Sequence, residues 1–252
     1  MTIRFLRRTL ALALAALAVT AHADEVQVAV AANFTAPAQK IAAAFEGDTG
    51  NTVKLSFGST GKFYSQIEAG APFDVLLAAD QATPEKLVGE GKGVAATRRT
   101  YAIGKLVLWS ADASLVDANG DVLKSDKFKH LSIADPKLAP YGEAAKETLE
   151  HLKLTSAVQS RLVTGDSIGQ AYQFVSTGNA ELGFVALGQV QPPDGSKAPG
   201  SMWMVPDSLY RPLKQDMVVL SASKVPAAAK AFTDYLASDK ARAIIKAYGY
   251  GW

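Results

Sequence analysis

Ser59 and Thr60 are the residues of this sequence whose types and position best fit ligand binding. They follow an alternating apolar run at 53–57, which predicts a strand, and precede Phe63 and Ile67, whose spacing predicts a short helix. Free backbone N–H groups and the positive end of the helix dipole meet where such a helix begins. Two hydroxyls at this place suit an anion without help from a charged side chain. Taken alone, the turn is also explained by Ser59 or Thr60 capping the helix.

Gly61 and Lys62 invite comparison with a phosphate-binding P-loop. That loop requires a glycine where this chain has Ser56, and a Ser or Thr where it has Phe63. Nucleotide binding is therefore not expected at this turn.

Three other predicted strand-to-helix junctions carry small or hydroxyl-bearing residues, at 32–35, 139–142 and 165–168. Ligands of open α/β sheets bind where strands end and helices begin. If the two halves of the chain form facing lobes, the four helix starts converge on one cleft. This coincidence favours a binding site over four separate caps. We expect Thr35, by contrast, to cap its own helix.

The junction at 165–169 also matches the G-x-S-x-G pattern of serine hydrolases, with Ser167 as the nucleophile. That chemistry needs a histidine base later in the chain, and no histidine follows His151. A serine hydrolase is therefore the weaker alternative. No other acid–base set in the sequence points to an enzyme.

The order of the predicted elements indicates an α/β fold. Strands are expected at 26–31, 53–57 and 73–78 in a first set, and at 130–134, near 162, at 182–187 and at 202–205 in a second. A helix follows each strand of the first set, which predicts a mainly parallel sheet covered by helices. The apolar segment at 101–109 fits a crossing between lobes, and 215–220 fits the return. Two helices, at 226–237 and 240–248, close the chain.

These crossings divide the chain after residue 23 into two expected lobes. The first is discontinuous and consists of 24–102 together with 218–252. The second consists of 103–217. About 229 residues are enough for two such units.

Residues 1–23 have the features of a secretory signal peptide. Three arginines precede an apolar run at 9–20 that is too short for an ordinary transmembrane helix, and Ala21-His22-Ala23 fits cleavage after Ala23. No cysteine comes after this segment to carry a lipid. We therefore expect a soluble protein that is exported to the periplasm.

The charge of the chain argues against nucleic acid as a partner. The full sequence has 26 basic and 24 acidic residues, and residues 1–23 hold three of the basic ones. The chain from residue 24 onward is therefore nearly neutral, and it has no basic cluster. With no cysteine, and with only His130 and His151 beyond residue 23, a thiolate or histidine metal site is not expected either.

Five segments match the motifs of a known family: VAANFT (30–35), SFGSTG (56–61), QIEAGAPFD (66–74), ADP (134–136) with PYG (140–142), and LGFV (182–185). On these residues, the chain resembles the periplasmic molybdate-binding proteins of ABC importers. The resemblance covers nearly all of the chain after residue 23, and its most specific part is 66–74.

The resemblance implies a two-lobed periplasmic-binding-protein fold of type II, with a mixed, mainly parallel sheet in each lobe and the ligand in the cleft. It implies that the protein holds molybdate or tungstate and delivers it to a membrane permease. No cofactor is implied, and we expect a monomer. The residues that match ligand positions are Asn33 and Thr60 in the first lobe and Tyr141 and Ile168 in the second, with Ala32, Ser59 and Ser167 as further candidates.

The chain departs from some members of the family at Ala186, where those members supply a tyrosine ligand. Other members use an asparagine and an earlier tyrosine instead. Asn33 and Tyr141 make this sequence similar to the second kind.

A site made only of donors selects an anion that carries no proton. The hydroxyls of Thr60 and Tyr141, the amide of Asn33 and backbone N–H groups can donate to all four oxygens of a tetrahedral dianion. Phosphate keeps a proton at neutral pH and needs an acceptor. Asp166 could provide one, although we expect it to cap its helix. Sulfate, phosphate and chromate stay open as alternative ligands.

Overall fold

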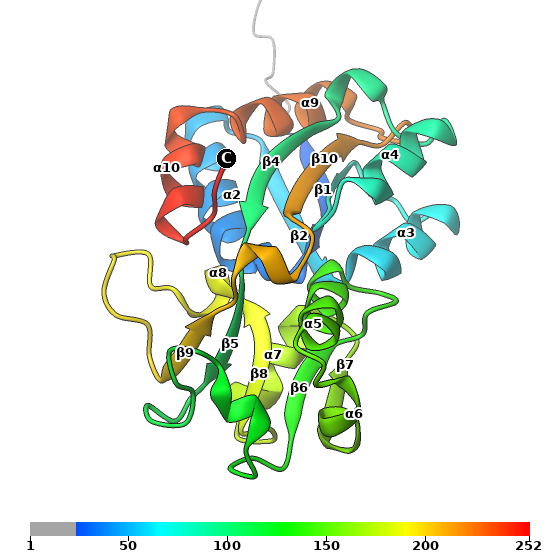
Figure 1. Ribbon diagram of the computed structural model, residues 1–252. Helices are drawn as coiled ribbons and strands as arrows, with labels where there is room; N and C mark the ends of the chain where they lie inside the picture. The colour runs from blue at the N-terminus through cyan, green and yellow to red at the C-terminus, as the bar shows by residue number, and fades with distance from the viewer. Residues whose placement is uncertain (1–23) are drawn as a thin grey trace, which may run out of the picture.

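The computed structural model describes residues 24–252, so the predicted signal peptide and its cleavage after Ala23 lie outside the described residues. Figure 1 shows two α/β lobes, one above the other, joined by strands that pass between them. Within the described part of the chain, no helix is long and apolar enough to cross a membrane.

The first lobe is built on a five-stranded sheet in the order β2-β1-β3-β10-β4. Its strands are β1 (Glu25–Ala31), β2 (Thr52–Gly58), β3 (Val75–Leu77), β4 (Arg99–Gly104) and β10 (Leu213–Val219). Strand β1 pairs in parallel with β2 and β3, whereas β10 is antiparallel to both β3 and β4. Four strands therefore run one way and β10 runs the other.

The second lobe repeats this arrangement in the order β7-β6-β8-β5-β9. Its strands are β5 (Leu106–Ser110), β6 (Leu131–Ala134), β7 (Leu162–Gly165), β8 (Leu182–Ala186) and β9 (Ser201–Met204). Strand β5 is the antiparallel member, between β8 and β9. The prediction of a mixed, mainly parallel sheet in each lobe is confirmed.

The chain crosses between the sheets twice, from β4 to β5 through Lys105 and from β9 back to β10. The return is complete by Leu213, which pairs with Gly104, so the chain joins the first sheet before the expected boundary at 217/218. The reason is that β10 needs residues 213–217 to pair along the length of β4. Polar Gln215 and Asp216 interrupt the apolar pattern there and hide the start of the strand.

Helices cover both faces of each sheet (Figure 1). The first lobe carries η1 (Ala32–Phe34), α2 (Thr35–Thr49), α3 (Thr60–Glu68), α4 (Ala82–Gly89), η2 (Ala95–Thr97), α9 (Pro226–Tyr235) and α10 (Asp239–Ala247). The second carries η3 (Asp121–Lys124), α5 (Pro140–His151), α6 (Thr155–Val158), η4 (Gln159–Arg161), α7 (Ile168–Ser176), α8 (Leu187–Val190) and η5 (Asp207–Leu209). The sequence patterns did not predict the short α6 and α8, because four residues show no periodicity.

The C-terminal helices α9 and α10 pack with α2 against the first sheet. Phe45 of α2 meets Phe232 of α9 edge to face, with ring centroids 5.3 Å apart. Ile41 and Ile245 are fully buried in the same cluster. Burying each such side chain contributes about 1.5–3 kcal/mol. The last residues of the chain are thereby tied to the first lobe.

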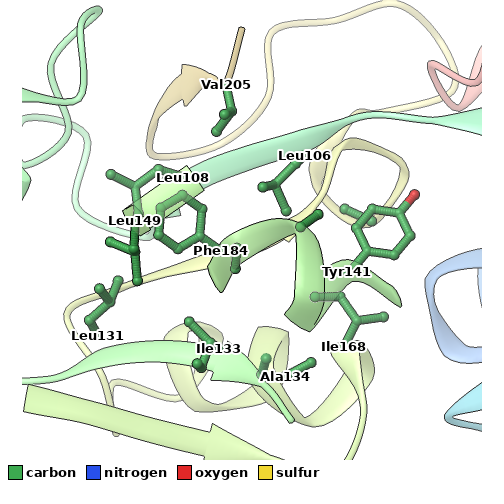
Figure 2. Close-up of a cluster of buried hydrophobic side chains, with 14 of the residues drawn as sticks. Leu106, Leu108, Leu131, Ile133, Ala134, Tyr141, Leu149, Ile168, Phe184 and Val205 are labelled. Carbon is green, nitrogen blue, oxygen red and sulfur yellow. The ribbon is translucent and has the colours of Figure 1, made fainter. Parts of the chain in front are cut away.

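The core of the second lobe lies between its sheet and α5. Leu106, Leu108, Leu149 and Phe184 pack together there (Figure 2). Tyr141 closes the edge of this cluster, and its hydroxyl points away from the packed side chains. The apolar core thus positions a polar group at the boundary between the lobes.

Candidate functional site

A small pocket between the lobes brings the predicted site residues together. Six of the seven line it: Ala32, Asn33, Ser59, Thr60, Tyr141 and Ile168. They come from the strand-to-helix junctions β1–η1, β2–α3, β6–α5 and β7–α7. The pocket is small, with a volume of about 10 Å³, which is about the space that one water needs.

The two hydroxyls of the first lobe do not cap their own helix. Ser59 is the N-cap residue of α3, but its side chain makes no capping bond. Its Oγ is buried and has no hydrogen-bond partner within residues 24–252. Thr60 Oγ1 accepts a 3.0 Å hydrogen bond from the N–H of Ala79, which leaves its own proton to donate. Both hydroxyls line the pocket, and neither proton is used to cap α3.

Asn33 is 1% exposed and is held from two sides. Its Nδ2 donates to Gln215 Oε1 at 2.9 Å and to the Tyr250 hydroxyl at 3.2 Å. The Tyr250 hydroxyl donates in turn to the Asn33 carbonyl at 2.7 Å. Asn33 Oδ1 is buried and unpartnered among the described residues. The Asn33 side chain is thus held in place through Nδ2, while Oδ1 has no hydrogen-bond donor among the described residues.

Tyr141 reaches from the second lobe to the crossing strands. Its hydroxyl accepts a 3.2 Å hydrogen bond from Gln215 Nε2. The two groups lie over Gly104, where a Cβ would stand 2.0 Å from the Tyr141 hydroxyl and 2.6 Å from Gln215 Nε2. Only glycine fits this position. Donation by the phenol to the ligand stays a prediction; in the structure its oxygen lies against Gln215, next to the crossing.

Burial raises the pKa values of Tyr101, Tyr141 and Tyr250 above the usual range, because the interior disfavours their phenolates. All three hydroxyls therefore keep their protons at neutral pH. They surround Gln215 and Asn33 as neutral hydrogen-bonding groups and add no negative charge.

The second lobe presents the N-termini of α5 and α7 to the pocket. Pro140 and Tyr141 are the first two residues of α5, and Ile168 is the first of α7. The N–H groups of a helix's first turn have no partner inside the helix and carry its positive dipole end. Tyr141 and Ile168 therefore offer backbone donors to an anion.

Ser167 caps α7 rather than lining the pocket. Its Oγ accepts a 3.3 Å hydrogen bond from the N–H of Gln170. His151, at the end of α5, has its Nδ1 2.9 Å from the carbonyl of Glu147 in its own helix. Ser167 is thus used structurally, and the serine-hydrolase alternative is not supported.

Two further expectations are corrected by the structure. Thr35 does not cap α2: its hydroxyl donates to the Ala32 carbonyl at 2.9 Å instead of accepting from a backbone N–H. Asp166 does not cap α7 and does not line the pocket; its carboxylate pairs with Lys62 at 2.6 Å, and both side chains are well exposed. Ala186 does not line the pocket. Its N–H donates to Gln189 Oε1, and Gln189 Nε2 donates to the Ile168 carbonyl.

Gln215 and Tyr250 were not identified from the sequence. Gln215 is 0% exposed and lies between Lys214 and Asp216 in a strand that ends in apolar residues. A polar residue in such a strand is a usable signal, because a buried amide must find partners. Tyr250 gave no comparable signal, since it is third from the end of the sequence and reaches Asn33 only through the fold.

No charged side chain lines the pocket in the part of the chain that the structure describes. Nor do the described residues include a cluster of three or more His, Cys, Asp or Glu that could hold a metal ion. Hydroxyls, amides and helix N-termini must supply all the stabilisation of a ligand. Such a site suits a desolvated anion.

Two lobes of equal topology, joined by crossing strands around a polar pocket without charged side chains, define a two-lobed solute-binding protein. The chain belongs to the bacterial extracellular solute-binding protein family, whose model matches residues 26–251. It is 60% identical over 245 residues to the molybdate-binding protein ModA of Azotobacter vinelandii, an alignment that covers 97% of each chain. Identity to ModA of Rhodobacter capsulatus is 53%, over 93% of this chain and 91% of that one.

Solved structures agree with this assignment. The periplasmic molybdate-binding protein of Azotobacter vinelandii superposes with a TM-score of 0.88 at 42% identity, over 90% of this chain and 99% of the other. The sulfate-binding protein SubI of Mycobacterium tuberculosis superposes with a TM-score of 0.72 at 16% identity, over 91% of this chain and 86% of the other, and so shares the fold alone. The family resemblance seen in the sequence is confirmed.

Proposed function

We propose that this protein captures molybdate in the periplasm and delivers it to the membrane permease of an ABC importer. The observation that carries the proposal is the pocket between the lobes, lined by hydroxyls, an amide and two helix N-termini and by no carboxylate. The similarity to proteins named as molybdate-binding supports the choice of ligand.

The chemistry of the pocket explains how it would hold a dianion. An oxyanion that leaves water must recover several kcal/mol of hydration per charge. We place the donors at the hydroxyls of Ser59 and Thr60, the side chain of Asn33, and the backbone N–H groups of Tyr141 and Ile168. Each bond to a charged acceptor contributes about 1.5–3 kcal/mol. Ala32 supplies close backbone contact, and Ser167 acts only through the start of α7.

Donors from both lobes make ligand binding and lobe closure one event. Ser59 and Thr60 belong to the first lobe, whereas Tyr141 and Ile168 belong to the second. The anion can satisfy all of them only when the lobes are together. The closed form is then the state that the permease receives.

Tungstate has the same charge and tetrahedral shape as molybdate and fits the same donors. Phosphate is disfavoured because it carries a proton and the pocket has no carboxylate to accept it. Sulfate carries no proton but is smaller, so its oxygens reach fewer donors at once. We expect a monomer that needs no cofactor, exported after cleavage behind Ala23.

Titration calorimetry of the exported protein with sodium molybdate, tungstate, sulfate, chromate and phosphate tests the proposal. Molybdate and tungstate should bind at least about tenfold more tightly than the others, a difference of about 1.4 kcal/mol. Binding of molybdate no tighter than sulfate contradicts it. The mass of the protein recovered from the periplasm tests the cleavage site.

A further inference from the structure

Gln215 lies at the centre of a buried hydrogen-bond network that joins site residues of both lobes. Its Oε1 accepts from Asn33 Nδ2 at 2.9 Å and from the Tyr101 hydroxyl at 3.1 Å. Its Nε2 donates to the Tyr141 hydroxyl at 3.2 Å. The residue stands on β10, just after the return crossing, and is 0% exposed. One carboxamide thus contacts Asn33 of the first lobe and Tyr141 of the second.

This network leaves one atom unsatisfied. Asn33 Oδ1 is buried, makes no hydrogen bond within residues 24–252, and belongs to a residue that lines the pocket. A buried acceptor without a donor costs free energy. It would also repel an oxyanion, because both groups can only accept. The arrangement therefore suits the unliganded protein better than the liganded one.

A joint rotation of two amides removes the conflict, in exchange for the 3.2 Å bond from Asn33 Nδ2 to the Tyr250 hydroxyl. Turning the carboxamides of Asn33 and Gln215 by 180° exchanges oxygen and nitrogen with almost no change in shape. Gln215 Nε2 then donates to Asn33 Oδ1, and Gln215 Oε1 accepts the proton of the Tyr141 hydroxyl. Tyr101 keeps its own proton on the Ala78 carbonyl, which lies 3.0 Å away. Asn33 Nδ2 is released toward the place where Oδ1 had no partner.

We propose that Gln215 is the positioning residue that sets which end of the Asn33 carboxamide faces the oxyanion, and that ligand binding turns both amides together. The inference rests on the proposed function, since it needs an oxyanion in the pocket. It makes Gln215 a determinant of specificity for ligands without a proton, because only the turned arrangement presents a donor from Asn33.

The first test follows the two side-chain amides by nuclear magnetic resonance. The exported, ¹⁵N-labelled protein is titrated with sodium molybdate, and the NH₂ signals of Asn33 and Gln215 are assigned through bonds from the backbone. Both pairs of signals should shift together as the site fills. An Asn33 shift with Gln215 unchanged, or no shift of either at saturation, overturns the inference.

The second test is a double-mutant cycle on molybdate affinity with Gln215→Met and Asn33→Ala. Met keeps the unbranched shape of Gln but has no donor or acceptor to orient Asn33. In the unmodified protein, Gln215→Met should lower molybdate affinity about tenfold. In the Asn33→Ala background, the same substitution should lower it less than about threefold. Equal losses in both backgrounds overturn the inference. If Asn33→Ala binds too weakly to measure, the resonance experiment decides.

Gln81→Met is the matched control. Gln81 is a partly buried amide of the first lobe whose Nε2 donates to Thr100 and Asp216 at 3.1 Å each, without touching Asn33 or Tyr141. It should lower the free energy of unfolding and leave affinity unchanged. If the unmodified protein binds no molybdate at all, the proposed function fails. If it binds but the amides are uncoupled, only this inference fails.

Discussion

The backbone N–H of Gly61 donates a 2.9 Å hydrogen bond to the carbonyl oxygen of Leu138. Gly61 lies in the first turn of α3 in the first lobe, and Leu138 precedes α5 in the second. A Cβ on Gly61 would stand 3.1 Å from that carbonyl oxygen and 3.2 Å from the Leu138 Cα. The lobes therefore meet backbone to backbone beside the pocket.

Gly61→Ala should weaken molybdate binding, because the added methyl group holds the lobes apart where the pocket must close. Overpacking of this kind costs about 1–2 kcal/mol, or about five- to thirtyfold in affinity, mainly as faster dissociation. Stopped-flow and calorimetric measurements check this. Gly47→Ala is the control, since nothing lies within 4 Å of its position, and it should stabilise α2 without changing affinity.

Thr60→Ala should lower affinity by about 1.5–3 kcal/mol, which is roughly ten- to over a hundredfold, because it removes a donor to a charged acceptor. Thr60→Ser keeps the hydroxyl that accepts from the N–H of Ala79 and should retain most of the affinity. Calorimetry compares the two.

Thr35→Ala is the companion control. The Thr35 hydroxyl donates to the Ala32 carbonyl and not to the pocket. Its loss should lower the free energy of unfolding while affinity stays the same. An affinity loss equal to that of Thr60→Ala would contradict the assignment of Thr60 as a ligand residue.

Ser59→Ala should separate stability from binding. The Ser59 hydroxyl is buried without a partner in the described chain, so removing it should leave the unliganded protein as stable as before or about 1 kcal/mol more stable. Affinity for molybdate should nevertheless fall about tenfold, because a donor is lost. Thermal unfolding with and without ligand measures both. A loss of stability with unchanged affinity would mean that the hydroxyl is structural.

Tyr141→Phe should cost less than Thr60→Ala. The phenol bonds to Gln215, and we place the donation by Tyr141 at its backbone N–H, which Phe keeps. We expect a loss of about 0.5–1.5 kcal/mol, the usual contribution of a neutral hydrogen bond. A loss as large as that of Thr60→Ala, measured by the same titration, would show that the hydroxyl donates to the anion directly.

Lys62→Gln should change affinity only slightly. Lys62 and Asp166 form a 2.6 Å ion pair between the lobes, but their side chains are 46% and 66% exposed. Exposed pairs contribute about 0.2–1 kcal/mol and are screened by salt. We expect less than a fivefold loss at low ionic strength and none at about 1 M salt. A large loss that persists in high salt would contradict this.

The elements that carry the site could be predicted because their signals are local. The alternation of β2 and the helical spacing of Phe63 and Ile67 span a few residues, and they place Ser59 and Thr60 between a strand and a helix. The same reasoning placed Tyr141 and Ile168 at helix starts. It erred at Thr35 and Asp166, where a local cap was expected and a different bond formed.

The sequence by itself determined the α/β pattern, the junctions that line the pocket and the family, since each depends on neighbouring residues. Only the tertiary structure decided which side chains complete the site. Gln215 stands 182 positions from Asn33, and Tyr250 stands 217 positions away. These contacts exist because β10 crosses back into the first sheet and the chain end packs beside it, bringing distant amides and hydroxyls into one buried space. A buried polar group must then bond to whatever the fold places within reach, and no local pattern of residues records that choice.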